Sequence, residues 1–180
     1  MRPADVALRG ITSSTAFRAS AAPYLVLGGE LRICAANVAY ERATHHRSSD
    51  MLREFMFDVF PDNPATPEAR SVERLAASFE RALRRGEPDR MALQRYDVPA
   101  ASYGFVQKSW LPVNSPIRDA DGRTIGILHH VEDVTRMVAT TGLELDLATR
   151  RLGPRGTPVG GGLVDARRAP RPGPAALPRR

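Results

Sequence analysis

The sequence is poor in cysteine, and Cys34 is its single thiol. One cysteine excludes an internal disulfide framework and a metal site built from several thiolates, and it is typical of a reducing compartment. Long hydrophobic runs are also lacking, because no window approaches the roughly 18 consecutive apolar residues of a membrane-spanning helix. Residues 1–11 carry charges at Arg2, Asp5 and Arg9, where a secretory signal would be uninterrupted and apolar. These absences predict a cytoplasmic protein without a membrane segment.

Unbalanced charge is confined to one end of the chain. The formal net charge is +6, and residues 151–180 hold seven Arg and one Asp, so residues 1–150 are neutral overall. The tail is rich in Pro and Gly and has few large apolar side chains, so we expect residues 153–180 to be disordered. An Arg-rich tail can bind phosphates, but a solvated tail of biased composition is the favoured interpretation, and nucleic acid is not an expected partner.

The first sixty residues alternate short strands and helices. We expect a flexible segment over residues 1–13, and then a short helix capped by Ser14 or Thr15. Asn37 suits the N-cap of a second short helix. The further expected elements are two strands joined by a tight turn, at residues 24–27 and 31–35, and a helical segment over residues 49–60.

One long amphipathic helix is predicted from Thr66 as N-cap and Pro67 at the first helical position to a stop at Gly86. Its apolar residues recur at helical spacing and are Val72, Leu75, Ala76, Phe79, Ala82 and Leu83. Three extended runs follow at residues 91–98, 105–114 and 124–134. This order predicts an α+β fold, with a five-stranded antiparallel sheet and helices packed on one face. An exit helix is expected over residues 137–152.

Five short motifs, in order along the chain, carry a resemblance to a known family. They are Pro-Tyr-Leu-Val-Leu at 23–27, Asn-Val-Ala-Tyr at 37–40, Asp-Val-Phe-Pro-Asp-Asn-Pro at 58–64, Trp-Leu-Pro-Val-Asn-Ser-Pro at 110–116 and His-His-Val-Glu-Asp-Val-Thr at 129–135. Together they resemble the PAS family, and specifically the bacterial signalling domains found beside histidine kinases. We assign the domain to residues 14–136.

The resemblance implies a non-catalytic sensory and protein-interaction module in bacterial signal transduction. Such modules commonly form homodimers, and the residues after Thr135 are too few for an output domain, so we expect a separate signalling partner such as a kinase or phosphatase of a two-component system. Asp133, Val134 and Thr135 resemble the motif that joins the last strand of the family to its output helix, and are assigned to signal transmission.

Strand alternation predicts a ligand pocket between the last strand and the long helix, because Ile125, Ile127, His129 and Val131 share one face. The candidate lining residues are Met56, Val72, Leu75, Phe79, Leu111, Ile125, Ile127 and His129. A mostly apolar pocket of this kind suits a small hydrophobic ligand. The cofactor is left open, and no covalently bound one is expected.

A haem- or flavin-binding redox or gas sensor is the alternative function. Haem-binding relatives usually hold iron through a histidine on the long helix, and residues 68–85 contain none. His129 is therefore interpreted as a hydrogen-bonded core histidine, and no metal site is predicted. Cys34 lies in a strand, whereas flavin-binding light sensors carry their cysteine in a helical region, so it is interpreted as an inert core thiol.

Catalysis is not expected, since neither Asp58 with Asp62 nor Glu132 with Asp133 has a histidine or nucleophile at catalytic spacing. The chain is therefore predicted not to be an enzyme. Trp110 is either a core anchor or an interface anchor, and its alternation with Val106 and Lys108 favours the interface.

Overall fold

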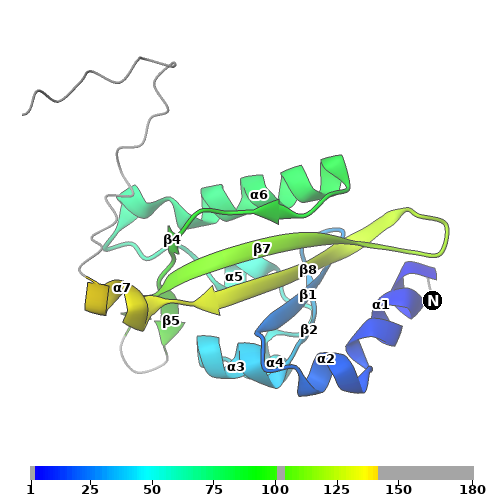
Figure 1. The fold of residues 1–180 in the computed structure, drawn as a ribbon, viewed down its shortest axis with the longest axis horizontal. Coiled ribbons are helices and arrows are strands. Elements are labelled where there is room, and N and C mark those ends of the chain that lie inside the picture. The colour runs from blue at the N-terminus through cyan, green and yellow to red at the C-terminus, as the bar shows by residue number, and fades with distance from the viewer. Residues whose placement is uncertain (1–2, 101–103, 142–180) are drawn as a thin grey trace, which may run out of the picture. The chain divides into compact units, whose positions relative to one another are not determined.

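The computed structural model describes residues 3–100 and 104–141. Figure 1 shows the order of the elements along the chain. They are α1 (Pro3–Thr12), α2 (Thr15–Ala19), β1 (Tyr24–Gly28), β2 (Ile33–Ala36), α3 (Val38–Thr44), α4 (Ser48–Met51), α5 (Met56–Val59), the 3-10 helix η1 (Pro67–Ala69), α6 (Ser71–Arg85), β3 (Asp89–Arg90), β4 (Gln94–Arg95), β5 (Val98–Ala100), β6 (Gly104–Val106), β7 (Ser109–Arg118), β8 (Thr124–Asp133) and α7 (Thr135–Thr141).

The main sheet is antiparallel, with the strand order β2-β1-β8-β7-β3, and the short strand β4 also pairs with β7. The predicted α+β fold is confirmed, but within the described residues this sheet has six strands rather than the five predicted, because the short strands β3 and β4 each pair with β7. Strand β8 lies at the centre and pairs with β1 on one side and with β7 on the other. Gly126 of β8 lies close against β1, because an added β-carbon there would collide with the carbonyl oxygen of Leu27. The last strand is thus held from both sides.

Local signals placed several of the early elements correctly. The β1–β2 turn is closed by a hydrogen bond from Gly28 N to the Arg32 carbonyl at 2.9 Å. Ser14 caps α2, since its hydroxyl accepts a hydrogen bond from Phe17 N at 3.2 Å. Asn37 caps α3 in the same way. Gly86 ends α6 in the left-handed conformation with φ +67°, as a C-terminal glycine should.

Helix α6 begins later than predicted. Residues 67–69 form η1, Arg70 turns left-handed with φ +46°, and Thr66 makes no side-chain cap. The cap comes from further back in the chain: Asp62 Oδ1 accepts hydrogen bonds from the backbone N of Ser71 at 2.9 Å and of Val72 at 3.0 Å. A carboxylate placed there satisfies two of the free N–H groups of the first turn.

The segment over residues 49–60 is divided rather than continuously helical. Helices α4 and α5 are separated because the chain between them pairs with β2. Arg53 N donates to the Ile33 carbonyl at 2.8 Å, and Ile33 N donates to the Glu54 carbonyl at 2.9 Å. Arg53 turns left-handed, with φ +71°, and the non-helical backbone here satisfies the outer edge of β2, which a continuous helix would leave open.

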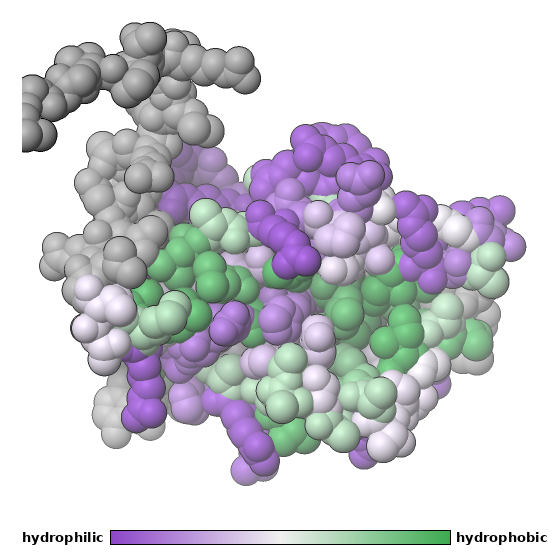
Figure 2. All heavy atoms as spheres, viewed as in Figure 1, coloured by the Kyte–Doolittle hydropathy of each residue, from purple (hydrophilic) through white to green (hydrophobic). Residues whose placement is uncertain are grey.

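Two apolar clusters lie on opposite faces of the sheet. The larger joins the sheet to α3, α5 and α6, and includes the fully buried Leu25, Leu27, Met51, Phe79 and Ile127. Figure 1 shows α6 running alongside β7 and β8. Figure 2 shows hydrophilic side chains gathered along the outward side of this helix, as its amphipathic pattern predicts.

The smaller cluster, on the other face, consists of Leu8, Phe17, Val26 and Ile117. Leu8 belongs to α1, so the structure differs from the flexible segment expected over residues 1–13. Burying Leu8 and half-burying Ile11 against the sheet gives this segment the apolar contact that a short helix needs in order to persist. Cys34 also packs against this cluster and is half-buried.

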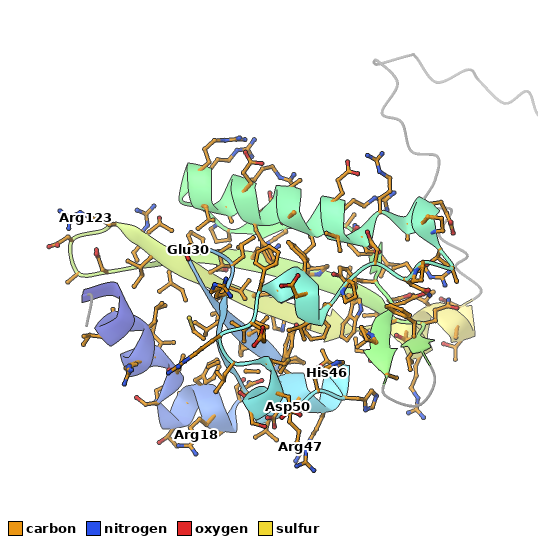
Figure 3. The ribbon with its side chains drawn as sticks, turned by 180° about the vertical axis from the view of Figure 1, so that it is seen from behind. Arg18, Glu30, His46, Arg47, Asp50 and Arg123 are labelled. Carbon is orange, nitrogen blue, oxygen red and sulfur yellow. The ribbon has the colours of Figure 1, made fainter. Side chains whose placement is uncertain are left out.

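Helix α7 starts at Thr135, two positions before the expected exit helix over residues 137–152. Residues 142–152, and the tail 153–180 expected to be disordered, lie outside the described residues. None of the helices described in residues 3–100 and 104–141 is long and apolar enough to span a membrane. Figure 3 shows Arg18, Arg47 and Asp50 along the edge of the fold built by α2 and α4, on the side away from α6.

Candidate functional site

A cavity of about 40 Å³ lies between the sheet and the helices of the larger cluster. Its lining residues are Tyr40, Thr44, Met56, Phe60, Ser71, Leu75, Met91, Gln94, Tyr96, Val98, Trp110, Pro112, His129 and Val131. A cavity of this volume holds a few water molecules, whereas sites for drug-sized ligands usually measure about 300–1,000 Å³. Side chains therefore fill most of the predicted pocket, and a small space remains at its centre.

Three of the predicted lining residues, Met56, Leu75 and His129, border this cavity. Phe79 and Ile127 are fully buried in the same cluster but do not reach the cavity wall. Val72 is partly buried at the edge of that cluster. The long helix was thus oriented correctly, with the cavity beside its first half.

Leu111 and Ile125 lie elsewhere. In β7 the neighbours of Leu111, Trp110 and Pro112, are buried and line the cavity, so alternation leaves Leu111 half-buried on the other face. Ile125 packs against the smaller cluster. The register of the β7–β8 pair shifts between Ile117, which pairs with Gly126, and Arg118, which pairs with Thr124. Ile125 is therefore skipped, and this irregularity interrupts the simple alternation in β8.

Trp110 is a core residue, and the expected interface role is wrong. Its side chain is 4% exposed, and its Nε1 donates a hydrogen bond to the Tyr96 carbonyl at 2.8 Å. Tyr96 in turn donates from its hydroxyl to the Phe60 carbonyl. These two bonds tie the segment before β5 to β7 and to the loop after α5. Alternation counted from Val106 does not apply to Trp110, because Val106 belongs to β6 of a separate two-stranded sheet and Trp110 to β7 of the main sheet.

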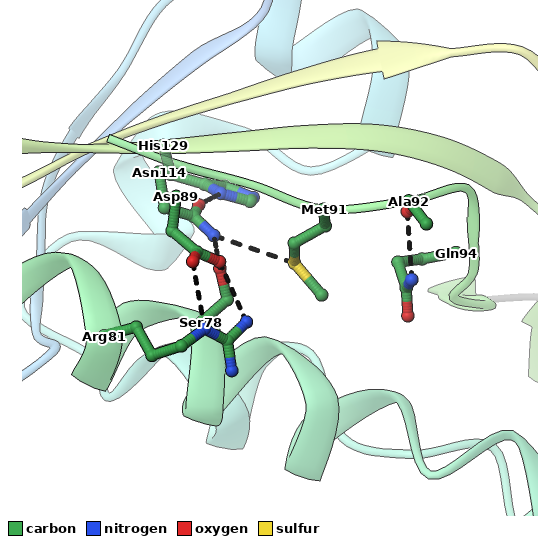
Figure 4. Close-up of polar contacts among 8 residues, drawn as sticks. All are labelled: Ser78, Arg81, Asp89, Met91, Ala92, Gln94, Asn114 and His129. Atoms are coloured by element: carbon green, nitrogen blue, oxygen red, sulfur yellow. Dashed lines mark hydrogen bonds and ion pairs between the residues drawn. The ribbon is translucent and has the colours of Figure 1, made fainter. Parts of the chain in front are cut away.

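A row of polar side chains crosses the core from the cavity to the surface (Figure 4). His129 Nδ1 lies 2.6 Å from Asn114 Oδ1, and Asn114 Nδ2 donates to Ser78 Oγ at 2.6 Å. Ser78 Oγ donates to Asp89 Oδ2 at 2.5 Å, and Arg81 donates to both Asp89 oxygens at 2.9 Å. Buried polar groups are thereby paired across β8, β7, α6 and β3. We call these five residues the polar row.

His129 is neutral in this setting. Burial, aided by the charge of neighbouring His130, lowers the pKa of His129 to about 3. Its ring makes edge contacts with Tyr40 and Phe79, with centroids 6.1 Å and 5.4 Å away. The interpretation of His129 as a hydrogen-bonded core histidine is confirmed.

Asp89, at the outer end of the polar row, is ionised. The hydrogen bond from Arg81 outweighs the effect of burial and, with the Ser78 hydroxyl, lowers the pKa of this carboxyl. The Arg81 side chain is 36% exposed, so the row ends at solvent.

Gln94 adds a polar group to the cavity wall. Its Nε2 donates to the carbonyls of Ala92 at 2.9 Å and Leu93 at 3.1 Å. Its Oε1 is buried and finds no hydrogen-bond partner among the residues that the structure describes. A buried carbonyl oxygen without a donor costs free energy, so this atom is available to a donor brought in from outside.

The signal-transmission residues form a compact junction between the sheet and α7. Asp133 Oδ1 accepts hydrogen bonds from the backbone N of Thr135 at 3.0 Å and from its hydroxyl at 2.5 Å, and Oδ2 pairs with Lys108 at 2.6 Å. Thr135 Oγ1 accepts from Ser109 N at 3.0 Å. Val134, 5% exposed, is buried between them. The junction fixes the first turn of α7 to the start of β7.

Metal chemistry finds no support in the described ranges 3–100 and 104–141, where no three His, Cys, Asp or Glu side chains cluster as ligands. Cys34 lies in β2 and is not among the residues that line the cavity.

Comparison with solved structures identifies the fold. The structure resembles the PAS domain of a protein from Colwellia psychrerythraea, with a TM-score of 0.54 and 14% identity over 67% of this chain and 92% of that one. It also resembles the LOV protein of Rhodobacter sphaeroides, with a TM-score of 0.55 and 14% identity over 78% and 72%. For VqmA of Vibrio cholerae the TM-score is 0.53, at 16% identity over 69% of this chain and 51% of VqmA.

A search of curated proteins found no match. The family model described as the PAS fold matches residues 17–139, which is more than half of the chain and contains every strand of the main sheet, the cavity and the junction with α7. The chain therefore belongs to the PAS family of sensory domains.

Proposed function

We propose that this protein is a non-catalytic sensory and protein-interaction module of bacterial signal transduction, and that it acts in the cytoplasm on a separate output protein. One observation carries the proposal: β8 connects the cavity to the junction. His129 and Val131 line the cavity, and Asp133 lies two positions further along the same strand. A ligand that changes the packing around the cavity therefore acts on the same strand that holds α7.

The coupling needs two arrangements of the junction with different affinities for a ligand or partner. The Lys108–Asp133 pair suits such a role, because the Lys108 side chain is 14% exposed and the Asp133 side chain 28% exposed. Partly exposed ion pairs contribute little free energy, about 0–1 kcal/mol, so small forces can open them. A small ligand can change the free-energy difference between the two arrangements by this amount, in either direction.

We further propose a homodimer, and a kinase or phosphatase as the output partner. Vibrio cholerae VqmA has been solved as a dimer, which supports self-association in this fold. Size-exclusion chromatography with light scattering at tens of micromolar tests this part. A monomer across that range would contradict it.

Nucleic acid is not proposed as a partner of the described domain. VqmA has also been solved in a complex with DNA, but this chain covers 60% of the VqmA chain in that structure. The basic residues 151–180 carry the excess charge of the present chain. Removing them should abolish any DNA binding, and DNA binding that survives the truncation would overturn this assignment.

Haem or flavin binding is the weaker candidate. A 40 Å³ cavity is far smaller than either group, and α6 has no histidine to ligate iron. The absorption spectrum of the purified chain distinguishes the two candidates. Visible absorption from a bound cofactor would replace the present proposal by a redox or gas sensor.

Hydrogen exchange at α7 tests the sensory proposal directly. A compound that raises the melting temperature should also change the exchange rate of amides in residues 136–141, although α7 does not line the cavity. Leu52, 43% exposed and outside the cavity wall, offers the matched control Leu52→Ala, which should leave this response intact. Stabilisation without any change at α7 would contradict signal transmission through β8.

A further inference from the structure

The polar row has a fixed direction of hydrogen bonding. Arg81 can donate hydrogen bonds but cannot accept them, so both oxygens of ionised Asp89 act as acceptors. The hydroxyl of Ser78 has one hydrogen, and the contact of 2.5 Å with Asp89 Oδ2 uses it. Ser78 Oγ is left as an acceptor for its second neighbour.

Asn114 therefore presents its NH₂ group to Ser78 and its carbonyl to His129. The opposite orientation of the amide would place two acceptors, Asn114 Oδ1 and Ser78 Oγ, 2.6 Å apart. Met91 Sδ, a weak acceptor 3.7 Å from Asn114 Nδ2, agrees with this orientation. The amide is thus assigned by its neighbours on both sides.

His129 must then donate from Nδ1, because Asn114 Oδ1 can only accept. A fully buried, neutral imidazole carries a single N–H. The other ring nitrogen, Nε2, therefore holds a lone pair. The state of a cavity-lining side chain is set by the arginine at the far end of the polar row.

The rest of the cavity wall limits the ligand further. Among the residues that the structure describes, the lining includes no Asp, Glu, Lys or Arg, so none of these side chains compensates a charged ligand. Gln94 Oε1 is a further acceptor in the wall, buried and without a partner within residues 3–100 and 104–141. Met56 and Met91 line the cavity as well, and flexible methionine side chains can repack to enlarge a small space.

We propose that this cavity selects small, neutral, mostly apolar compounds that carry an N–H or O–H donor, and that His129 Nε2 or Gln94 Oε1 accepts that hydrogen bond. The inference rests on the proposed function, because it takes the cavity to be the sensory site. Compounds of the same shape whose heteroatom only accepts hydrogen bonds bind more weakly, since they cannot donate to either acceptor of the wall.

The state of His129 is tested without any ligand. In the full chain labelled with ¹⁵N, the imidazole nitrogens of His129 should show a protonated Nδ1 and an unprotonated Nε2 at pH 7.5. Ser78→Ala should relax this preference, because it disconnects Asn114 from Asp89. A proton found on Nε2 in the wild type would overturn the assignment.

Ligand selection is tested with pyrrole and furan, which have the same ring size, while pyrrole donates a hydrogen bond and furan cannot. Binding by ligand-observed NMR should favour pyrrole by about 3- to 10-fold, the range of one net hydrogen bond. Gln94→Met and His129→Leu are assayed in parallel, and the preference should fall in at least one of them.

The outcomes separate the two proposals. Furan binding as tightly as pyrrole, or a preference for pyrrole that stays the same in both variants, would overturn the donor-selective site and leave the sensory module standing. Binding of neither probe at millimolar concentration would overturn both the site and the sensory use of the cavity.

Discussion

Asn37 and Tyr24, thirteen positions apart, are joined by a hydrogen bond of 3.0 Å from the Tyr24 backbone N to Asn37 Oδ1. The same oxygen accepts from Tyr40 N at 2.9 Å, and Nδ2 donates to the carbonyl oxygens of Phe17, Ser20 and Ala22. One buried amide thus organises the end of α2, the start of β1 and the start of α3. Asn37 is 2% exposed.

Asn37→Ala should lower the free energy of unfolding by about 3 kcal/mol, since it removes a helix cap and leaves several buried backbone groups without partners. Urea unfolding measures this. Ser14→Ala is the matched control, because Ser14 caps α2 and is half-buried. It should cost about 1 kcal/mol. Equal losses in the two variants would show that the bonds beyond the cap contribute nothing.

Acid should destabilise the protein before its carboxylates titrate. The pKa of His129 is about 3 in the folded chain and 6.5 when unfolded. As the pH falls below 6.5 the unfolded chain gains a proton that the folded chain does not, so this source of stability is complete above pH 6.5 and is lost towards pH 3. The loss approaches about 1.4 kcal/mol per pH unit.

The measurement is urea unfolding at pH 7.5, 6.0 and 5.0. His129→Leu should be less stable at pH 7.5, by about 1–3 kcal/mol, because it leaves Asn114 Oδ1 without a donor. It should nevertheless lose less stability on acidification than the wild type. His130→Asn is the control. Burial lowers the pKa of His130 as well, but this side chain is only half-buried, whereas His129 is fully buried. A wild type equally stable at pH 7.5 and 5.0 would refute the assignment.

Asp133→Ala should free α7 and leave the rest of the fold in place. The substitution removes the ion pair with Lys108 and both hydrogen bonds to Thr135. Amide exchange in residues 136–141 should accelerate, while the free energy of unfolding falls by about 1 kcal/mol or less. Asp121→Ala, which removes the exposed pair with Arg123, should leave α7 exchange unchanged. Unaltered α7 exchange in Asp133→Ala would contradict the role of the junction.

Two glycine substitutions should change stability in opposite directions. Gly126→Ala places a β-carbon against the Leu27 carbonyl, and should cost at least about 2 kcal/mol. Gly10 lies in α1, where an added β-carbon meets nothing within 4 Å. Gly10→Ala should stabilise by about 0.5–1 kcal/mol. Thermal melting of both variants is sufficient, and a stabilised Gly126→Ala would show that β1 and β8 can separate without cost.

Features that depend on residues close together along the chain were predictable from the sequence. The Asn37 cap, the Gly86 stop and the apolar stripe with Leu75 and Phe79 are local patterns, and the structure contains all three. The start of α6 was missed because its cap, Asp62, acts from nine positions before Ser71. A cap supplied by tertiary structure leaves no signal in the first turn of the helix.

The site was harder to predict than the fold. His129 was found by strand alternation, but its partners were not, because Ser78 and Asn114 are 36 positions apart. Ser78 occupies a buried position among the apolar side chains of α6, and a prediction from hydrophobicity alone does not identify it. Asn114 belongs to the motif at residues 110–116, but nothing in that motif indicates which side chain it contacts.

Helix α1 covers part of the sheet face on which the smaller apolar cluster lies. Leu8 packs there with Val26 and Ile117, and Phe17 of α2 lies in the same cluster. A second copy seated on that face would need the same apolar atoms, so self-docking of α1 and association through the bare sheet are mutually exclusive. A second copy of the chain would therefore compete with α1 for this face of the sheet, and it would do so more strongly as the protein concentration rises.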